Sequence, residues 1–142
     1  MRENYRDRAV VIRTYDFGEA DRVIVLLTRD HGLVRAMAKG VRRAKSRFGS
    51  RLQLFVNLDV QLYVGKNLAT ISQADTVDYF GARLIEDYER YTAACAVLES
   101  AERLAFADAD HDPYLYESVT ATLGQLQTCL LYTSDAADDS LR

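Results

Sequence analysis

The sequence lacks tryptophan and has one proline and two cysteines among its 142 residues. Cys95 and Cys129 form neither a CxxC pair nor a metal-ligand spacing, which is typical of a reduced intracellular protein rather than of a disulfide framework. No stretch approaches the roughly 20 apolar residues that cross a bilayer. The N-terminal apolar run is too short and too charged for a signal peptide. These absences predict a cytoplasmic protein that has no membrane partner.

Catalytic patterns are also missing. The sequence contains no P-loop, GxGxxG, GxSxG or HExxH motif. His31 stands beside a turn glycine, and His111 lies in an acidic loop that lacks the glycine and the bidentate glutamate of a calcium-binding EF-hand. We therefore expect no enzymatic activity, no metal and no cofactor.

Charge is unevenly distributed along the chain. Residues 1–77 hold 14 basic and 8 acidic residues, a net of +6, whereas residues 78–142 hold 4 basic and 13 acidic residues, a net of -9. Such a division predicts an electropositive working half and an acidic remainder.

The first half reads as five strands, at residues 8–16, 22–28, 33–39, 54–64 and 68–77. The clearest pattern lies in 54–64, where apolar residues occupy every second position and predict a long strand with one buried face. Glycine-containing turns separate most of the strands. Five strands in a segment of this length favour an OB-fold, a five-stranded barrel that commonly binds oligonucleotides; an SH3-like barrel is the alternative.

After Phe80 the apolar spacing changes to three and four residues. Leu84 to Leu104 predict one amphipathic helix of about 20 residues, with Cys95 on its apolar face. Asp112 and Pro113 then predict the start of a second helix, as N-cap and first helical residue. The predicted class is α+β, with an OB-fold domain at residues 1–80 and a partial α-helical domain at 81–128.

Residues 129–139 read CLLYTSDAADD, which matches one reading frame of a transposon-type sequencing adapter. We expect residues 129–142 to be an assembly artefact that interrupts a longer gene near Thr128 and carries no functional weight. The alternative is a genuine disordered C-terminus.

The most informative segment is basic. Between His31 and Leu58 there is no acidic residue. The same window holds seven cations: Arg35, Lys39, Arg42, Arg43, Lys45, Arg47 and Arg51. Cations that are not neutralised locally repel one another, and a polyanion relieves that repulsion while releasing its own counterions. The pattern predicts a nucleic-acid-binding surface.

Aromatic rings beside such a surface can stack on bases. Phe48 lies inside the basic segment and is the leading candidate. Tyr15, Phe55 and Tyr63 are weaker candidates, because aromatic residues on strands are usually part of the core.

These residues carry a family resemblance. The hairpin YDFGEADRVIVLLT, the run Lys39-Gly40-Val41-Arg42-Arg43, the run Lys45-Ser46-Arg47-Phe48 and the pair Leu52-Gln53 resemble the N-terminal part of the RecO family of bacterial DNA repair proteins. The resemblance extends over about residues 5–128 and is strongest over the first 80.

The resemblance implies an OB-fold followed by a helical domain. It also implies binding of single- and double-stranded DNA, annealing of complementary strands, and help in loading RecA onto DNA coated by single-strand-binding protein, together with a RecR-like partner. The region that contacts single-strand-binding protein is expected to be missing from this chain. Two other functions stay open: an adaptor whose basic loop binds an acidic protein tail, and an RNA-binding OB protein.

Overall fold

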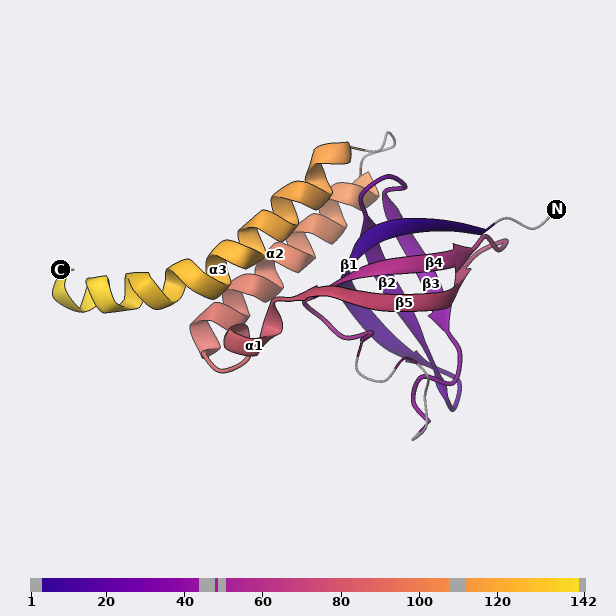
Figure 1. Cartoon of the computed structure of the whole chain (residues 1–142), viewed down its shortest axis with the longest axis horizontal. Coiled ribbons are helices and arrows are strands. Elements are labelled where there is room, and N and C mark those ends of the chain that lie inside the picture. Colours follow the sequence, from indigo (N-terminus) through magenta and orange to yellow (C-terminus); the bar gives the residue numbers. More distant parts are fainter. Residues whose placement is uncertain (1–3, 44–47, 49–50, 108–111, 141–142) are drawn as a thin grey trace.

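The computed structural model describes residues 4–43, 48, 51–107 and 112–140. Strands come first and helices last (Figure 1). The strands are β1 (Asn4–Phe17), β2 (Asp21–Thr28), β3 (Leu33–Ala38), β4 (Val56–Tyr63) and β5 (Ala69–Tyr79). The helices are α1 (Gly81–Leu84), α2 (Tyr88–Ala107) and α3 (Pro113–Ser140).

The five strands close into a barrel in the order β1-β2-β3-β5-β4. All neighbouring pairs are antiparallel except β3 and β5, which are parallel over a short register that includes Ala36 opposite Ala69. This arrangement confirms the predicted α+β class and is consistent with the OB-fold.

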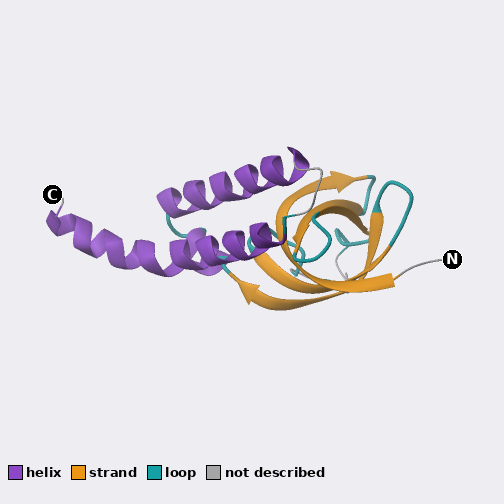
Figure 2. Cartoon of the chain, turned by 90° about the horizontal axis from the view of Figure 1, so that it is seen from above, coloured by secondary structure: helices purple, strands orange, loops and turns teal. Residues whose placement is uncertain are grey.

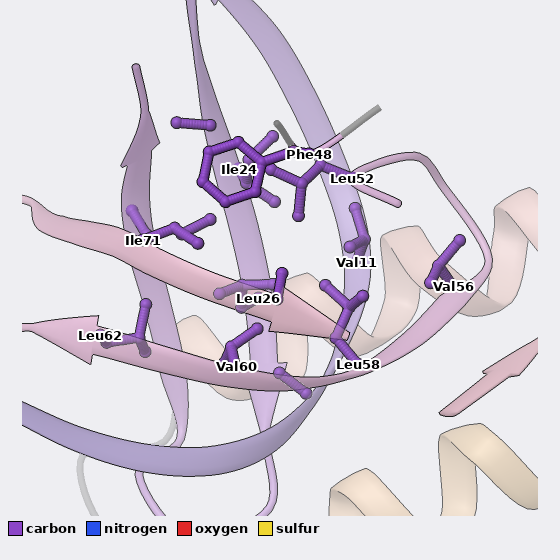
Figure 3. Close-up of a cluster of buried hydrophobic side chains, with 14 of the residues drawn as sticks. Val11, Ile24, Leu26, Phe48, Leu52, Val56, Leu58, Val60, Leu62 and Ile71 are labelled. Carbon is purple, nitrogen blue, oxygen red and sulfur yellow. The ribbon is translucent and has the colours of Figure 1, made fainter. Parts of the chain in front are cut away.

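One hydrophobic core fills the barrel. Alternate residues of β4 point into it, so Val56, Leu58, Val60 and Leu62 are all buried (Figure 3). The period-2 pattern therefore predicted the inward face of this strand correctly.

The start of β4 was predicted two residues too early. The strand begins at Val56, and Phe55 has a left-handed backbone with φ of 72°. The Phe55 amide donates to the Val11 carbonyl and the Phe55 carbonyl accepts from the Phe80 amide. Its buried ring meets the Tyr91 ring edge-on, with 5.8 Å between centroids. A contact with α2 thus overrides the local alternation, and this ring cannot stack on a ligand.

A bulge interrupts β1. Val11 pairs with Leu26 and Arg13 pairs with Val25, so Ile12 has no partner of its own in β2. An extra residue of this kind reverses the inside–outside alternation downstream of it. Val11, before the bulge, therefore faces into the barrel, whereas Tyr15 and Phe17, after it, face outward.

The long helices α2 and α3 lie side by side against one side of the barrel (Figures 1 and 2). A second core lies between them and the outer surface of β1 and β2, where Val10, Val25 and Leu27 meet Leu98 and Leu123. A buried hydrogen bond of 2.7 Å joins the Tyr116 hydroxyl of α3 to the Asn57 Oδ1 of β4. The predicted apolar faces thus dock on the barrel.

The first predicted helix is divided in two. α1 ends at Leu84 and α2 begins at Tyr88. The Asp87 carboxylate accepts hydrogen bonds from the amides of Glu89 and Arg90, at 3.0 and 3.4 Å. It therefore caps α2, and local capping overrides the continuous apolar spacing. Leu104, expected on the buried face, is 60% exposed.

The second helix begins where the sequence predicted. The Asp112 carboxylate accepts a hydrogen bond of 2.9 Å from the Tyr114 amide. Val119 and Leu123 are buried, and Leu115 and Leu126 are partly buried against the same core. The Asp-Pro start is therefore confirmed.

Candidate nucleic-acid interface

The helices leave part of the outer surface of β1, β2 and β3 uncovered. Residues that pair across antiparallel strands point to the same side, so the register assigns each side chain to a face. Val25 faces outward beneath α2, and its partners Arg13 and Arg35 share that side. We call this outward, uncovered surface the open face. It consists of Arg13, Tyr15, Phe17, Arg35, Met37 and Lys39, which surround the buried Val23.

Two predicted cations lie on or next to β3 in this face. Arg35 and Lys39 are exposed, while Ala36 and Ala38 between them point into the barrel core. The alternation thus places both charges outward, as the sequence predicted for this strand.

The turn after β3 brings two more cations to the end of the open face. Gly40 has φ of 69°, a left-handed conformation that glycine adopts without strain. The Gly40 amide donates to the Asp21 carboxylate at 2.7 Å, and the Arg42 amide donates to the Ala20 carbonyl at 2.9 Å. These bonds hold the turn against the β1–β2 hairpin, beside the end of β1.

Arg42 and Arg43 differ in their surroundings. The Arg42 guanidinium donates to the Gly18 carbonyl at 3.1 Å and lies 3.5 Å from the Asp16 carboxylate. Asp16 also pairs with Arg22 at 3.0 Å. Arg42 is therefore positioned and partly neutralised. Within the described part of the chain, no carboxylate pairs with Arg35, Lys39 or Arg43.

The other predicted site residues do not join this group. Arg51 lines a polar groove of about 340 Å³ along β5, together with Ser72, Gln73 and Asp75. Lys45 and Arg47 lie outside the described residues. The structure thus brings together Arg35, Lys39, Arg42 and Arg43 on β3 and the turn after it, while Arg51 lines the groove along β5.

The assignment of Phe48 as a stacking residue is corrected. Its side chain is 3% exposed and points into the barrel core with Leu52, near Ile24 and Ile71 (Figure 3). Burial of a large aromatic ring is favourable, and the barrel end provides the space for it. Phe48 closes the core and is not part of the interface.

Sequence reasoning missed two members of the open face. Phe17 was left outside the predicted strands, and Arg13 was given no role, yet Phe17 is 49% exposed and the Arg13 side chain is 58% exposed. Strict alternation from Val11 would have turned both inward. The bulge at Ile12 turns Arg13 and Phe17 outward, and no residue type in the sequence indicates this bulge.

His31 has a structural partner. Asp7, 5% exposed, accepts hydrogen bonds from the amides of Arg8 and Asp30, and its Oδ2 lies 2.7 Å from the His31 Nδ1. The His31 ring lies against the Tyr5 ring at 4.1 Å between centroids, and burial, with Asp7 nearby, raises the pKa of Tyr5. This cluster fixes the β2–β3 turn. Among the described residues no group of histidine, cysteine and carboxylate side chains could hold a metal ion.

Over the described residues, no helix combines the length and the apolar character that crossing a bilayer needs.

A closed five-stranded barrel followed by helices is consistent with the OB-fold class, whose members commonly bind oligonucleotides. Residues 1–80 match the family model described as "Recombination protein O N terminal". The chain therefore belongs to the RecO family, and this membership supports a role in recombination and DNA repair.

Proposed function

We propose that this protein binds single- and double-stranded DNA through the open face and the adjoining turn, and that it anneals complementary strands during recombinational repair. In this proposal it acts as a mediator and not as an enzyme. It works with a RecR-like protein to load RecA onto DNA that is coated by single-strand-binding protein, whose own contact region is expected to be missing from this chain. Family membership supports the pathway, and the geometry supports the surface.

The observation that carries the proposal is the group of cations at and after the end of β3. Arg35, Lys39 and Arg43 have no carboxylate partner in the described part of the chain. Neutralising them with phosphates releases counterions from the nucleic acid, which supplies the free energy of binding. Such contacts position a strand without reading its sequence.

A triple change, Arg35→Ala, Lys39→Ala and Arg43→Ala, tests the proposal. We expect weaker binding to all DNA sequences and slower annealing of complementary oligonucleotides, measured by fluorescence anisotropy and by energy transfer between labelled strands. The matched control replaces Arg6, Arg29 and Arg83, three exposed cations outside the open face. Equal losses in both triple variants would contradict the assignment of the surface.

The same titrations decide between this function and the two alternatives. An RNA-binding protein would prefer RNA over DNA of identical sequence, since the 2′-hydroxyl distinguishes them locally. An adaptor would bind an acidic peptide more tightly than DNA at equal salt concentration. We expect DNA to be bound at least as tightly as either.

A further inference from the structure

We infer that Tyr15 and Phe17 form a stacking site for unpaired bases. The open face would then bind a single strand that carries bases more tightly than a sugar-phosphate backbone without bases. The inference rests on the proposed function, because it adds base recognition to the phosphate-binding surface. Its occupant is single-stranded DNA.

The bulge is the first observation. Before it, Ala9 and Val11 point into the barrel core. After it, Tyr15 and Phe17 are 40% and 49% exposed, although they continue the same odd-numbered series. Bulges that redirect side chains occur preferentially beside functional sites. Here the redirected side chains include two aromatic rings that would otherwise have been buried.

Spacing is the second observation. Tyr15 and Phe17 are two residues apart on one strand, which separates their Cα atoms by about 6.7 Å. Stacked bases lie about 3.4 Å apart. Two rings at this separation have room for one base between them or for two successive bases beside them.

The surroundings are the third observation. The guanidinium carbon of Arg13 lies 5.6 Å from the centre of the Tyr15 ring, and Arg13 is held there by an ion pair of 3.2 Å with Glu102 of α2. Arg13 thus limits the motion of the Tyr15 ring. Tyr15 pairs with the buried Val23 of β2, and Val23 pairs in turn with Met37 of β3. Met37 lies between Arg35 and Lys39 on that strand. The rings therefore border cations that can hold the phosphates of the same strand.

Single exposed aromatic residues are common and need no explanation. Two on one face, next to uncompensated positive charge, fit a ligand that is both apolar and anionic. A single strand has this combination, because its bases expose their faces and its backbone carries one charge per nucleotide. A duplex hides the same base faces within its stack.

The test compares two strands of equal charge: oligo(dT) of 20 nucleotides and an abasic strand of the same length. The full chain should bind oligo(dT) at least about tenfold more tightly, since each stacked base contributes a factor of roughly five or more. The double variant Tyr15→Ala, Phe17→Ala should bind both strands equally, at the level at which the unchanged chain binds the abasic strand. Tyr88→Ala, which removes an 82% exposed tyrosine of α2, should change neither affinity.

Each outcome decides between the two proposals. Equal binding of both strands by the unchanged chain, or a preference that survives in the double variant, would overturn the stacking site and leave the phosphate-binding surface intact. No binding of either strand would overturn both.

A second measurement avoids dependence on the stability of the double variant. The chain has no tryptophan, so Phe17→Trp introduces a single indole reporter. We expect oligo(dT) to quench its fluorescence and the abasic strand to leave it unchanged. The reporter Tyr88→Trp should respond to neither. An unquenched Trp at position 17 in a chain that binds oligo(dT) would contradict the inference.

Discussion

Individual residues in this protein take their roles from the elements beside them. Phe48 stands among arginines, lysines, glycines and serines in the sequence, yet its ring lies in the barrel core. Leu52 joins it there, so the basic segment contributes apolar residues at the end of the barrel. The local composition correctly indicated that this segment is basic, but it could not show that the Phe48 ring points into the core.

Phe48→Ala measures the corrected role. Removing a buried phenylalanine should lower the free energy of unfolding by about 3 kcal/mol or more, because it removes apolar contacts and leaves a cavity. Urea denaturation followed by circular dichroism reports this change. Phe106→Ala, which removes an 81% exposed ring, should cost far less. Similar costs for the two changes would contradict the burial of Phe48.

Asp7 is the buried carboxylate that fixes the β2–β3 turn through two backbone amides and His31. Asp7→Ala should lower the free energy of unfolding by about 2 to 3 kcal/mol, since the hydrogen bonds to this carboxylate are lost and two partly buried amides remain unpaired. Asp59→Ala removes a partly exposed ion pair with Arg6 and should cost at most about 1 kcal/mol. A cost for Asp7→Ala as small as that of its control would show that the turn does not depend on this carboxylate.

At the scale of elements, the sequence predicted all five strands and both long helices. Alternation and the three-to-four spacing report which face of an element is apolar, and most of these positions are buried, with Leu104 the exception noted above. The sequence pattern could not predict the bulge in β1, the left-handed residue before β4 or the break between α1 and α2 at Asp87. Each of these depends on a contact made by a distant segment or on a capping choice that apolar spacing does not encode.

The bulge also explains why the candidate site was only partly predictable. Uniform charge identified Arg35, Lys39, Arg42 and Arg43 because no acidic residue interrupts their segment. The aromatic members depend on a change of face that the sequence pattern contradicts. Register therefore decides the composition of the surface.

Tyr116 of α3 donates a buried hydrogen bond to Asn57 of β4. Tyr116→Phe should lower the free energy of unfolding by about 1 to 2 kcal/mol, because the buried Oδ1 of Asn57 loses its donor. Tyr114→Phe is the control, since Tyr114 is 72% exposed. Thermal melting of the helical signal compares the two, and identical melting curves would contradict the role of this bond.

Because of Tyr116, we also expect the free energy of unfolding to depend on pH. Burial raises the pKa of Tyr116 above the ordinary tyrosine value. The folded protein therefore holds the phenolic proton more tightly than the unfolded chain does. This contribution to stability is present at neutral pH and is lost as the pH rises above about 10. Tyr116→Phe should make the alkaline decline in stability shallower, which urea titrations at pH 8 and pH 10.5 measure; an unchanged decline would contradict the assignment.

At the scale of the whole molecule, positive charge belongs to the barrel and negative charge to the helical half. The two halves meet at the Arg13–Glu102 ion pair, at the border of the open face. Acidic residues of α2 border the basic surface there, and under the proposed function we expect a bound polyanion to be directed toward the end of β3 and the following turn.

The most direct test of the account is the salt dependence of binding to single-stranded DNA. Each phosphate contact contributes about 0.7 to the slope of log K against log salt concentration. Replacing Arg35, Lys39 and Arg43 with alanine should therefore make the slope shallower by about 2. A triple variant whose slope and affinity equal those of the unchanged chain would contradict the claim that this surface binds phosphates.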